Sequence, residues 1–322
     1  MQPVTPKKLL ISVVCPTFNE EKNVAELCER VRNVMVQFPQ YDYEHVIIDN
    51  ASTDETVEIL RKLASEDRRI KVIVNTRNFG HVRSYYHALL QVRGDAVVSM
   101  VSDLQDPPEM IADFLAEWEK GFKVVIGIRK NNPGNLFLVP IRKLYYFLMC
   151  WASETIQIRN FTGFGLFDGE VMRILRTLRE PYPYLRGIIP ELGFPMAKIP
   201  FEQPARKGGK SSLTFYTLYD YAMTGFVNYS RLPLRLAVFS GFGIGFVSFC
   251  IALFYFVMKL VFWHTFNLGL APIVIGMFFL GAVQLVFLGI LGEYVGAILV
   301  QVKDRPHVIE RERINFNTVE TD

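Results

Sequence analysis

The chain has 322 residues, of which 50% are hydrophobic and only 21% are charged, and its mean hydropathy is +0.20. This composition excludes a disordered protein, and it is more apolar than that of an ordinary soluble enzyme, so it predicts membrane segments. The formal net charge of +3 is too small to indicate a protein that binds nucleic acid.

The first part of the chain alternates short β-rich runs with stretches of helical periodicity. The expected strands lie at 10–15, 45–49, 70–74 and 96–101, and the expected helices lie at 20–38, 52–63 and 82–91. This order predicts an α/β fold with an open, mostly parallel sheet and helices on both faces. Sheets of this kind bind ligands at the carboxyl ends of their strands.

Carboxylates stand at the ends of three of these strands. Glu20 follows the first strand, Asp49 ends the second, and Asp103 follows the fourth. Oxygen ligands gathered in this way suit a hard divalent cation, Mg²⁺ or Mn²⁺, that arrives with a phosphorylated substrate. The chain has neither a P-loop motif nor a GxGxxG motif after a strand, which argues against an ATPase and against a dinucleotide-binding enzyme.

Two apolar runs near the C-terminus predict a membrane hairpin. Residues 236–258 carry no charge, and residues 260–292 have His264 as their only titratable group. About 20 apolar residues are enough for a helix to cross the hydrocarbon core. The alternative is a pair of buried core helices. Basic residues flank the runs and are sparse in the turn between them, which places the large N-terminal region and both termini in the cytoplasm.

The predicted organisation therefore has four parts on the inner (cytoplasmic) membrane. Residues 213–231 are rich in Phe and Tyr, which favours an amphipathic helix at the interface; a surface helix of the globular domain is the alternative. The parts are a cytoplasmic catalytic domain at 1–212, the interfacial region at 213–231, a hairpin at 232–302 with helices at about 235–262 and 271–300, and a cytoplasmic tail at 303–322.

Seven short motifs in a fixed order extend this interpretation. They are PTFNE at 16–20, IDNASTD at 48–54, RNFGH at 77–81, SDLQDPPE at 102–109, GIRK at 127–130, ARKGGKSS at 205–212 and LGEYVGAILVQVKDRP at 291–306. Together with the hairpin, they resemble the polyprenyl-phosphate sugar transferases of glycosyltransferase family 2, the group of bactoprenol glucosyltransferase and dolichol-phosphate mannose synthase. The resemblance implies a GT-A-type sheet.

The resemblance also implies roles for individual residues. The donor nucleotide would be held by Pro16, Phe18, Glu20 and Asp49, and the metal by Asp103 with Gln105. Phosphate of the donor or of the lipid would be bound by Arg129, Arg142, Arg206, Lys210, Ser211 and Ser212. A solvated basic loop, or one attracted to anionic lipid, is the alternative for the basic run from Arg206 to Lys210. The residues closest to the chemistry would be Asp103, Arg129, Asn160 and Arg206.

Two positions depart from the pattern of the family. Relatives usually carry Asp-x-Asp after the fourth strand, whereas here Val101 takes the first place and only Asp103 remains. Many relatives also have an aspartate, proposed as the general base, where this chain has Asn160. A phosphomonoester with a second pKa of about 6 is already a dianion at neutral pH and needs no base, so Asn160 favours a phosphate acceptor. Asp106 and Asp168 are secondary candidates for a base, and a helix N-cap is an equal alternative for Asp168.

The expected function is that of an inverting glycosyltransferase. It would move one sugar from a UDP-hexose such as UDP-glucose to polyprenyl (undecaprenyl) phosphate, giving a lipid-linked monosaccharide for envelope glycan modification. The resemblance further implies a homo-oligomer, for example a tetramer, and no nucleic-acid partner. One alternative is a transferase to a sugar hydroxyl or a polysaccharide synthase; the other is a catalytically silent membrane scaffold or sugar-nucleotide sensor.

Overall fold

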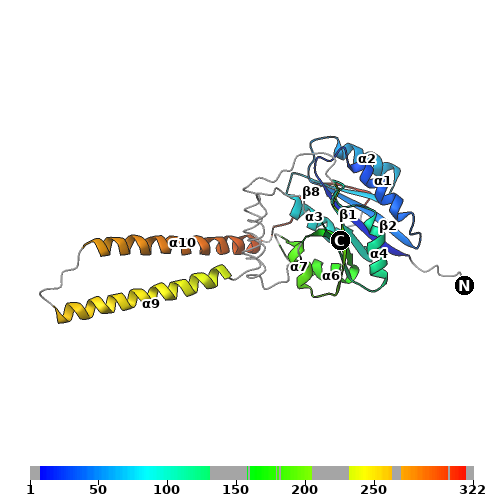
Figure 1. Ribbon diagram of the computed structural model, residues 1–322. Helices are drawn as coiled ribbons and strands as arrows, with labels where there is room; N and C mark the ends of the chain where they lie inside the picture. The colour runs from blue at the N-terminus through cyan, green and yellow to red at the C-terminus, as the bar shows by residue number, and fades with distance from the viewer. Residues whose placement is uncertain are drawn as a thin grey trace. The chain divides into compact units, whose positions relative to one another are not determined.

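The computed structural model describes residues 8–130, 158, 160–178, 180, 183–204, 232–262, 270–303 and 305–316. They belong to two units, an α/β unit and a helical hairpin (Figure 1). The predicted interfacial region at 213–231 lies outside the described residues, and so do Arg142, Arg206, Lys210, Ser211 and Ser212.

The α/β unit is built on an eight-stranded sheet in the order β7-β5-β6-β4-β1-β2-β3-β8. Its strands are β1 (Leu9–Thr17), β2 (Tyr41–Asp49), β3 (Ile70–Asn75), β4 (Ala96–Ser99), β5 (Val124–Arg129), β6 (Phe161–Asp168), β7 (Met196–Phe201) and β8 (Glu310–Ile314). The strands from β1 to β4 are parallel, whereas β6 runs antiparallel to β4 and β5. The predicted open, mostly parallel sheet is therefore confirmed.

Helices cover both faces of this sheet. One face packs against α1 (Val24–Met35), α2 (Thr56–Glu66) and α4 (Met110–Glu119), and the other against α3 (His81–Gln91), α6 (Gly169–Thr177) and α7 (Leu185–Glu191). Because both faces are covered, the central strand β1 is a nearly continuous apolar run, and every residue from Ile11 to Thr17 is buried.

The strand order reverses beside β1, and we call the region outside the carboxyl ends of the strands at that point the crevice. The chain leaves β1 for β2 on one side and later returns to β4 on the other side of β1. Ligands bind outside the carboxyl ends of strands at such a switch point. Since β6 is antiparallel, its first residues, near Asn160, lie at the same edge as the end of β4. The fold thereby brings the loops after β1, β2 and β4 together with the start of β6.

Residues 305–316 do not form the separate tail that the sequence predicts. Instead, β8 pairs with β3 as an antiparallel edge strand. Arg83 donates to the carbonyl of Pro306 at 2.8 Å, and the backbone N–H of Thr76 donates to the carbonyl of Ile309 at 2.9 Å. The alternating charges of this strand resemble those of a solvated tail, yet charged side chains are common on edge strands because they discourage further pairing.

Glu310 is the main polar contact between this strand and α3. His87 Nε2 lies 2.5 Å from Glu310 Oε1, and Arg313 Nη2 donates to the same oxygen at 2.7 Å. Burial by itself would raise the pKa of Glu310. The hydrogen bonds from His87 and Arg313 together have the larger effect and lower this pKa to about 2. The ionised carboxylate therefore stabilises the fold above its ordinary pKa of 4.5, and this contribution is lost as the pH falls towards 2.

We expect Glu310→Gln to destabilise the α/β unit by about 1 to 2 kcal/mol at neutral pH, after allowance for solvent screening. Thermal unfolding of the full chain in detergent measures this effect, with Glu312→Gln on the same strand as the control. The difference between wild type and Glu310→Gln should shrink as the pH is lowered below 4.5. A difference that stays constant at acidic pH would contradict the assignment.

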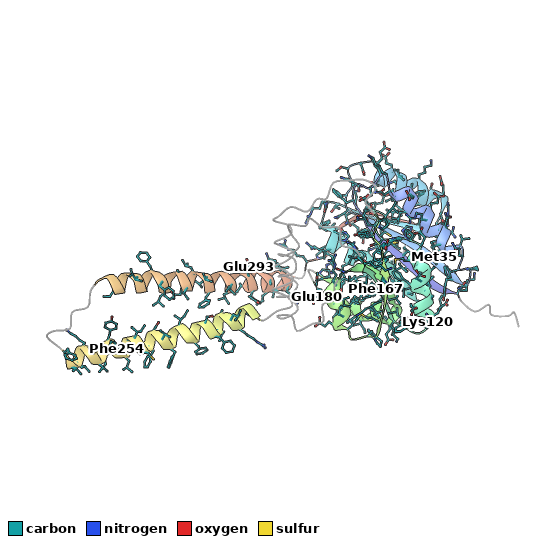
Figure 2. The ribbon with its side chains drawn as sticks, in the orientation of Figure 1. Met35, Lys120, Phe167, Glu180, Phe254 and Glu293 are labelled. Atoms are coloured by element: carbon teal, nitrogen blue, oxygen red, sulfur yellow. The ribbon has the colours of Figure 1, made fainter. Side chains whose placement is uncertain are left out.

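The second unit consists of α9 (Leu232–Val261) and α10 (Leu270–Val302). Each contains a 28-residue apolar segment of mean hydropathy 2.2, and none of the residues in the most apolar part of that segment is buried. Side chains such as Phe254 extend outward from the helices (Figure 2). Both helices are long and apolar enough to cross a membrane, and their exposure does not fit the alternative of a buried core pair.

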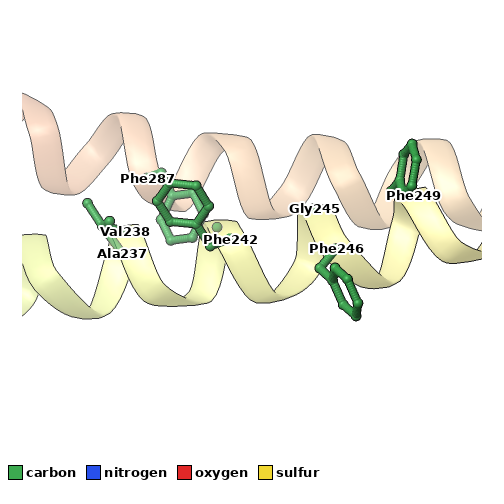
Figure 3. Close-up of a pocket in the computed structure, with 8 residues that line it drawn as sticks. Ala237, Val238, Phe242, Gly245, Phe246, Phe249 and Phe287 are labelled. Carbon is green, nitrogen blue, oxygen red and sulfur yellow. The ribbon is translucent and has the colours of Figure 1, made fainter.

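The two helices contact each other through small and aromatic residues. An apolar groove is lined by Ala237, Val238, Gly241, Phe242, Gly245, Phe246 and Phe249 of α9 and by Phe287 of α10 (Figure 3). A β-carbon added at Gly241 would lie 3.9 Å from Phe287, which is an ordinary van der Waals contact.

Candidate functional site

The crevice edge is marked by unusual backbone conformations. Four of its residues are not glycine and yet have left-handed backbones, with φ of 54° at Asn19, 62° at Ala51, 61° at Leu104 and 61° at Asn160. Each follows or precedes a different strand. Such conformations cost about 1 to 3 kcal/mol each and gather at functional sites, where the surrounding structure holds them in place.

The loop after β1 contains three of the predicted donor-binding residues. Pro16 is buried, whereas the ring of Phe18 is 43% exposed at the edge and is available for stacking on a flat ligand. Glu20 is buried, where its Oε2 accepts a hydrogen bond from Asn23 Nδ2 at 2.6 Å. Its backbone N–H donates to Thr56 Oγ1 at 2.9 Å. Glu20 therefore fixes the start of α1.

Asp49 organises the neighbouring loop. Its carboxylate is fully buried and accepts hydrogen bonds from the backbone and the hydroxyl of Ser52. Burial raises the pKa of Asp49, and the hydrogen bonds from Ser52 partly offset that rise. The hydroxyl of Ser52 also accepts from the backbone N–H of Asn19 at 2.9 Å. The ends of β1 and β2 are thus joined through one serine.

The RNFGH motif is attached to the same edge by asparagines. Asn50 Nδ2 donates to Asn78 Oδ1 at 2.7 Å, and Asn50 Oδ1 accepts from the backbone N–H of Phe79 at 2.9 Å. Asn78 Oδ1 also accepts from the backbone N–H of Gly80. These bonds set the path of the chain into α3, whose first residue is His81.

The loop after β4 carries the predicted metal ligands. The hydroxyl of Ser102 donates to the carbonyl of Pro16 at 2.9 Å, which holds this loop beside the end of β1. Asp103 is partly exposed, and its Oδ1 accepts from the backbone N–H of Gln105 at 3.1 Å. Within the described ranges, no group of three His, Cys, Asp or Glu side chains is placed to hold a metal ion. The residues fit a cation held by one or two carboxylates plus substrate phosphates, as Mg²⁺ commonly is.

Asp106, a secondary candidate in the sequence, lies beneath this loop. It is 2% exposed, its Oδ2 accepts from the backbone N–H of Val101 at 3.2 Å, and its Oδ1 has no hydrogen-bond partner in the described part of the chain. Burial raises the pKa of Asp106 to about 7, against the opposing effect of Arg129.

The other secondary candidate, Asp168, is not part of the site. It stands at the far end of β6, at the opposite edge of the sheet. Its Oδ1 accepts from the backbone N–H of Glu170 as the N-cap of α6, and its Oδ2 accepts from Trp118 Nε1 at 2.8 Å. A general-base role for Asp168 is therefore wrong.

Cations complete the crevice. Arg129 ends β5, and its backbone N–H donates to the carbonyl of Asn160 at 3.3 Å. Its Nε is buried and has no partner among the described residues. Burial lowers the pKa of Arg129, whereas the negative charge of Asp106 raises it. Asn160 itself is exposed at the start of β6.

Arg186 was missed in the sequence. It is exposed on α7 and interacts electrostatically with Asp106 and Arg129. Desolvation lowers the pKa of His81, and the charge of Arg186 lowers it further. The sequence does show a lone arginine within an apolar helical segment. That pattern alone does not indicate a site, because the residues near Arg186 are distant in the sequence.

The comparison with known proteins decides the family. The profile of the family described as Glycosyl transferase family 2 matches residues 12–177, which begin in β1 and run through the end of α6. The chain belongs to glycosyltransferase family 2. In this glycosyltransferase, eight of the predicted residues lie at or next to the strand ends that border the crevice. They are Pro16, Phe18, Glu20, Asp49, Asp103, Gln105, Arg129 and Asn160.

Similar proteins cover nearly the whole of this family 2 chain. An uncharacterized glycosyltransferase of Bacillus subtilis (strain 168) is 32% identical over 92% of this chain and 91% of that protein. The bactoprenol glucosyl transferase of Shigella phage SfV is 30% identical over 94% of this chain and 99% of that protein. Among solved structures, the mannosyl-3-phosphoglycerate synthase from Rubrobacter xylanophilus is 16% identical with a TM-score of 0.47, over 71% of this chain and 74% of that chain.

Proposed function

We propose that this glycosyltransferase moves one sugar from a nucleotide diphosphate donor, a UDP-hexose such as UDP-glucose, to the phosphate of a polyprenyl lipid, undecaprenyl phosphate. One observation supports the proposal above all others. The similarity to bactoprenol glucosyl transferase covers 94% of this chain, so it includes the crevice and at least part of both α9 and α10. Bactoprenol is a lipid, and its phosphate requires an enzyme held at the membrane surface.

The connectivity of the chain supports this location. Residues 8–204 precede α9, and β8, which follows α10, belongs to the same sheet. If both helices cross the membrane, the sheet must therefore lie on the side where α9 begins and α10 ends. Arg235, Lys303 and Arg305 stand at those ends, and positive charge favours the cytoplasmic side.

The crevice residues have complementary roles in this reaction. Phe18 stacks on the base, and Asp49 and Glu20 fix the loops that surround the nucleotide. Asp103, with Gln105, would hold Mg²⁺ or Mn²⁺ together with the donor diphosphate, and the bound cation would offset the negative charge that develops on the leaving diphosphate. Arg129 donates hydrogen bonds to phosphate oxygens in the same place.

The reaction needs no general base. A phosphate oxygen of the lipid attacks the anomeric carbon, the bond from that carbon to the diphosphate breaks, and UDP leaves with the electron pair. Because the attacking phosphate has already lost its protons, none must be removed during the step. In-line attack inverts the anomeric configuration. Asn160, exposed beside Arg129, can orient the acceptor by hydrogen bonding but cannot take up a proton.

The test uses the full chain in detergent with undecaprenyl phosphate, Mg²⁺ or Mn²⁺, and radiolabelled UDP- and GDP-sugars. Transfer of label into the organic phase is expected for one UDP-hexose. Release of UDP only when a sugar acceptor is added would instead favour a transferase to a sugar hydroxyl. Nucleotide binding without any transfer would favour a silent scaffold or sensor.

Arg186 gives a further test of the phosphate site. We expect Arg186→Gln to lower kcat/KM for sugar transfer by about 10-fold or more, because it removes a positive charge near Arg129, where the donor diphosphate would bind. The control is Arg173→Gln, which removes an exposed arginine from α6. Equal kinetics in the two variants would remove Arg186 from the site.

A further inference from the structure

The loop that joins β3 to α3 is held by two segments that are distant from it in the sequence. This loop, residues 76–80, belongs to no helix or strand. It follows the carboxyl end of β3, where Val74 pairs in parallel register with Asp49. A loop without the regular hydrogen bonds of a helix or strand must satisfy its backbone groups through other segments. The contacts with those segments therefore set its position.

Asn50 holds the loop from the side of the predicted nucleotide-binding residues. It directly follows Asp49, and its Oδ1 accepts hydrogen bonds from the backbone N–H of Phe79 at 2.9 Å and from the hydroxyl of Ser84 at 2.7 Å. Asn50 is 5% exposed and Ser84 is fully buried. Hydrogen bonds between buried groups are costly to break. The loop is therefore tied to the end of β2.

Residues 306–309 hold the loop from the C-terminal part of the chain. Thr76, its first residue, donates to the carbonyl of Ile309 through its backbone N–H at 2.9 Å and through its hydroxyl at 3.1 Å. Arg83, three residues after the loop, donates from Nη2 to the carbonyl of Pro306 at 2.8 Å. The segment 306–309 thereby connects the two ends of the loop. Since ionised donors make stronger hydrogen bonds than neutral ones, the bond from Arg83 is the main side-chain link.

The segment 306–309 has other contacts that fix it in place. Val308 is 4% exposed, and the ring of His307 packs edge-on against Tyr86 with the ring centroids 5.3 Å apart. The chain then continues into β8, which pairs with β3 and lies beside α3 (Figure 1). The ring contact and the strand pairing are made with α3 and β3 rather than with the loop. The segment can therefore serve as a support for the loop.

This support lies outside the part of the chain that the family profile matches, which ends at residue 177. We propose that residues 306–309 belong to the donor site, where they brace the loop 76–80 beside the nucleotide. Arg83 is the positioning residue that joins this support to the loop. The inference rests on the proposed function, in which the nucleotide lies next to Asp49. Arg83 acts through the loop and does not touch the donor.

The test compares wild type, Arg83→Gln and Arg83→Lys as full chains in detergent. The Kd of UDP is measured by calorimetry with Mn²⁺ present, and hydrogen exchange of the peptides that contain residues 76–83 is followed by mass spectrometry. We expect Arg83→Gln to weaken UDP binding by about 5- to 10-fold and to speed exchange in the loop, because the charged bond to Pro306 is lost. Arg83→Lys keeps one charged donor, which is enough for a single carbonyl, so it should bind UDP within about 3-fold of wild type.

The matched control removes a different contact of the same strand. Arg61 of α2 forms an ion pair with Glu312 of β8. Arg61→Gln should therefore leave both the UDP affinity and the exchange of the loop as they are in wild type. If Arg83→Gln does not fold, Thr76→Val replaces it, since it removes only the hydroxyl bond to Ile309. That variant should weaken UDP binding by about 2- to 3-fold.

The possible results distinguish this inference from the proposed function. UDP affinity in Arg83→Gln that equals that of wild type would overturn the inference, whether or not the loop exchanges faster, and would leave the proposed function intact. An equal loss of affinity in Arg83→Lys or in Arg61→Gln would also overturn it, because the loss would not come from the bond to Pro306. The expected pattern in a protein that transfers no sugar to lipid phosphate would support the inference and contradict the proposed function.

Discussion

Replacing Asp103 with alanine is expected to reduce the rate of sugar transfer by at least about 10²- to 10³-fold. Asp103 is partly exposed in the loop after β4, and Ser102 attaches that loop to β1 beside the donor-binding residues. Since Val101 supplies no carboxylate, the loss of Asp103 leaves little to hold a cation with the diphosphate. Initial rates of label transfer across a series of Mn²⁺ concentrations measure the effect.

Two comparisons make the Asp103 experiment specific. Asp113→Ala on α4 removes an exposed aspartate away from the crevice and should retain full activity. The unfolding temperature of Asp103→Ala, measured beside that of wild type, separates a loss of metal binding from a loss of folding. Activity like that of wild type in Asp103→Ala would remove this residue from the metal site.

Replacing Arg129 with glutamine should produce the second large effect, a fall in kcat/KM of about 10²-fold. Arg129 ends β5 beside Asn160, where it is partly exposed, and its buried Nε has no hydrogen-bond partner among the described residues. A planar guanidinium donates two parallel hydrogen bonds to phosphate, which an amide cannot do. Steady-state kinetics with varied donor and saturating lipid measure the change.

Arg129→Lys distinguishes charge from geometry at this position. Lysine keeps the positive charge but lacks the planar fork of donors, so its activity should fall between wild type and Arg129→Gln. Kinetics in Arg129→Gln that match wild type would remove Arg129 from the phosphate site.

The sequence was sufficient to predict the parts of the fold that depend on local periodicity. The buried run from Ile11 to Thr17, the helix that buries Val24, Leu27 and Val31, and the two long apolar helices all follow from patterns in one segment of chain. The edge that gathers Asp49 and Asp103 followed from the rule that parallel strands end on one side. These predictions needed no knowledge of distant contacts.

The features that were missed depend on residues far apart in the sequence. Glu310 is charged and follows a long apolar helix, and the pairing of its segment with β3 and its contact with His87 of α3 both come from distant parts of the chain. Arg186 is an ordinary residue in its own segment, and the charged groups near it, Asp106 and Arg129, are distant in the sequence. For Asp168 the sequence left a base and a helix N-cap as alternatives, and the structure shows the N-cap of α6.

The measurement that tests the phosphate acceptor most directly compares two lipids as acceptors for this chain in detergent. Undecaprenyl phosphate and undecaprenol are offered with the same radiolabelled UDP-hexose and metal, and extracted label is followed over time. The account predicts rapid labelling of the phosphate and none of the alcohol, because Asn160 cannot deprotonate a hydroxyl. Transfer to undecaprenol at a comparable rate, or to neither lipid while a soluble sugar is glycosylated, would contradict the phosphate acceptor on which the mechanism depends.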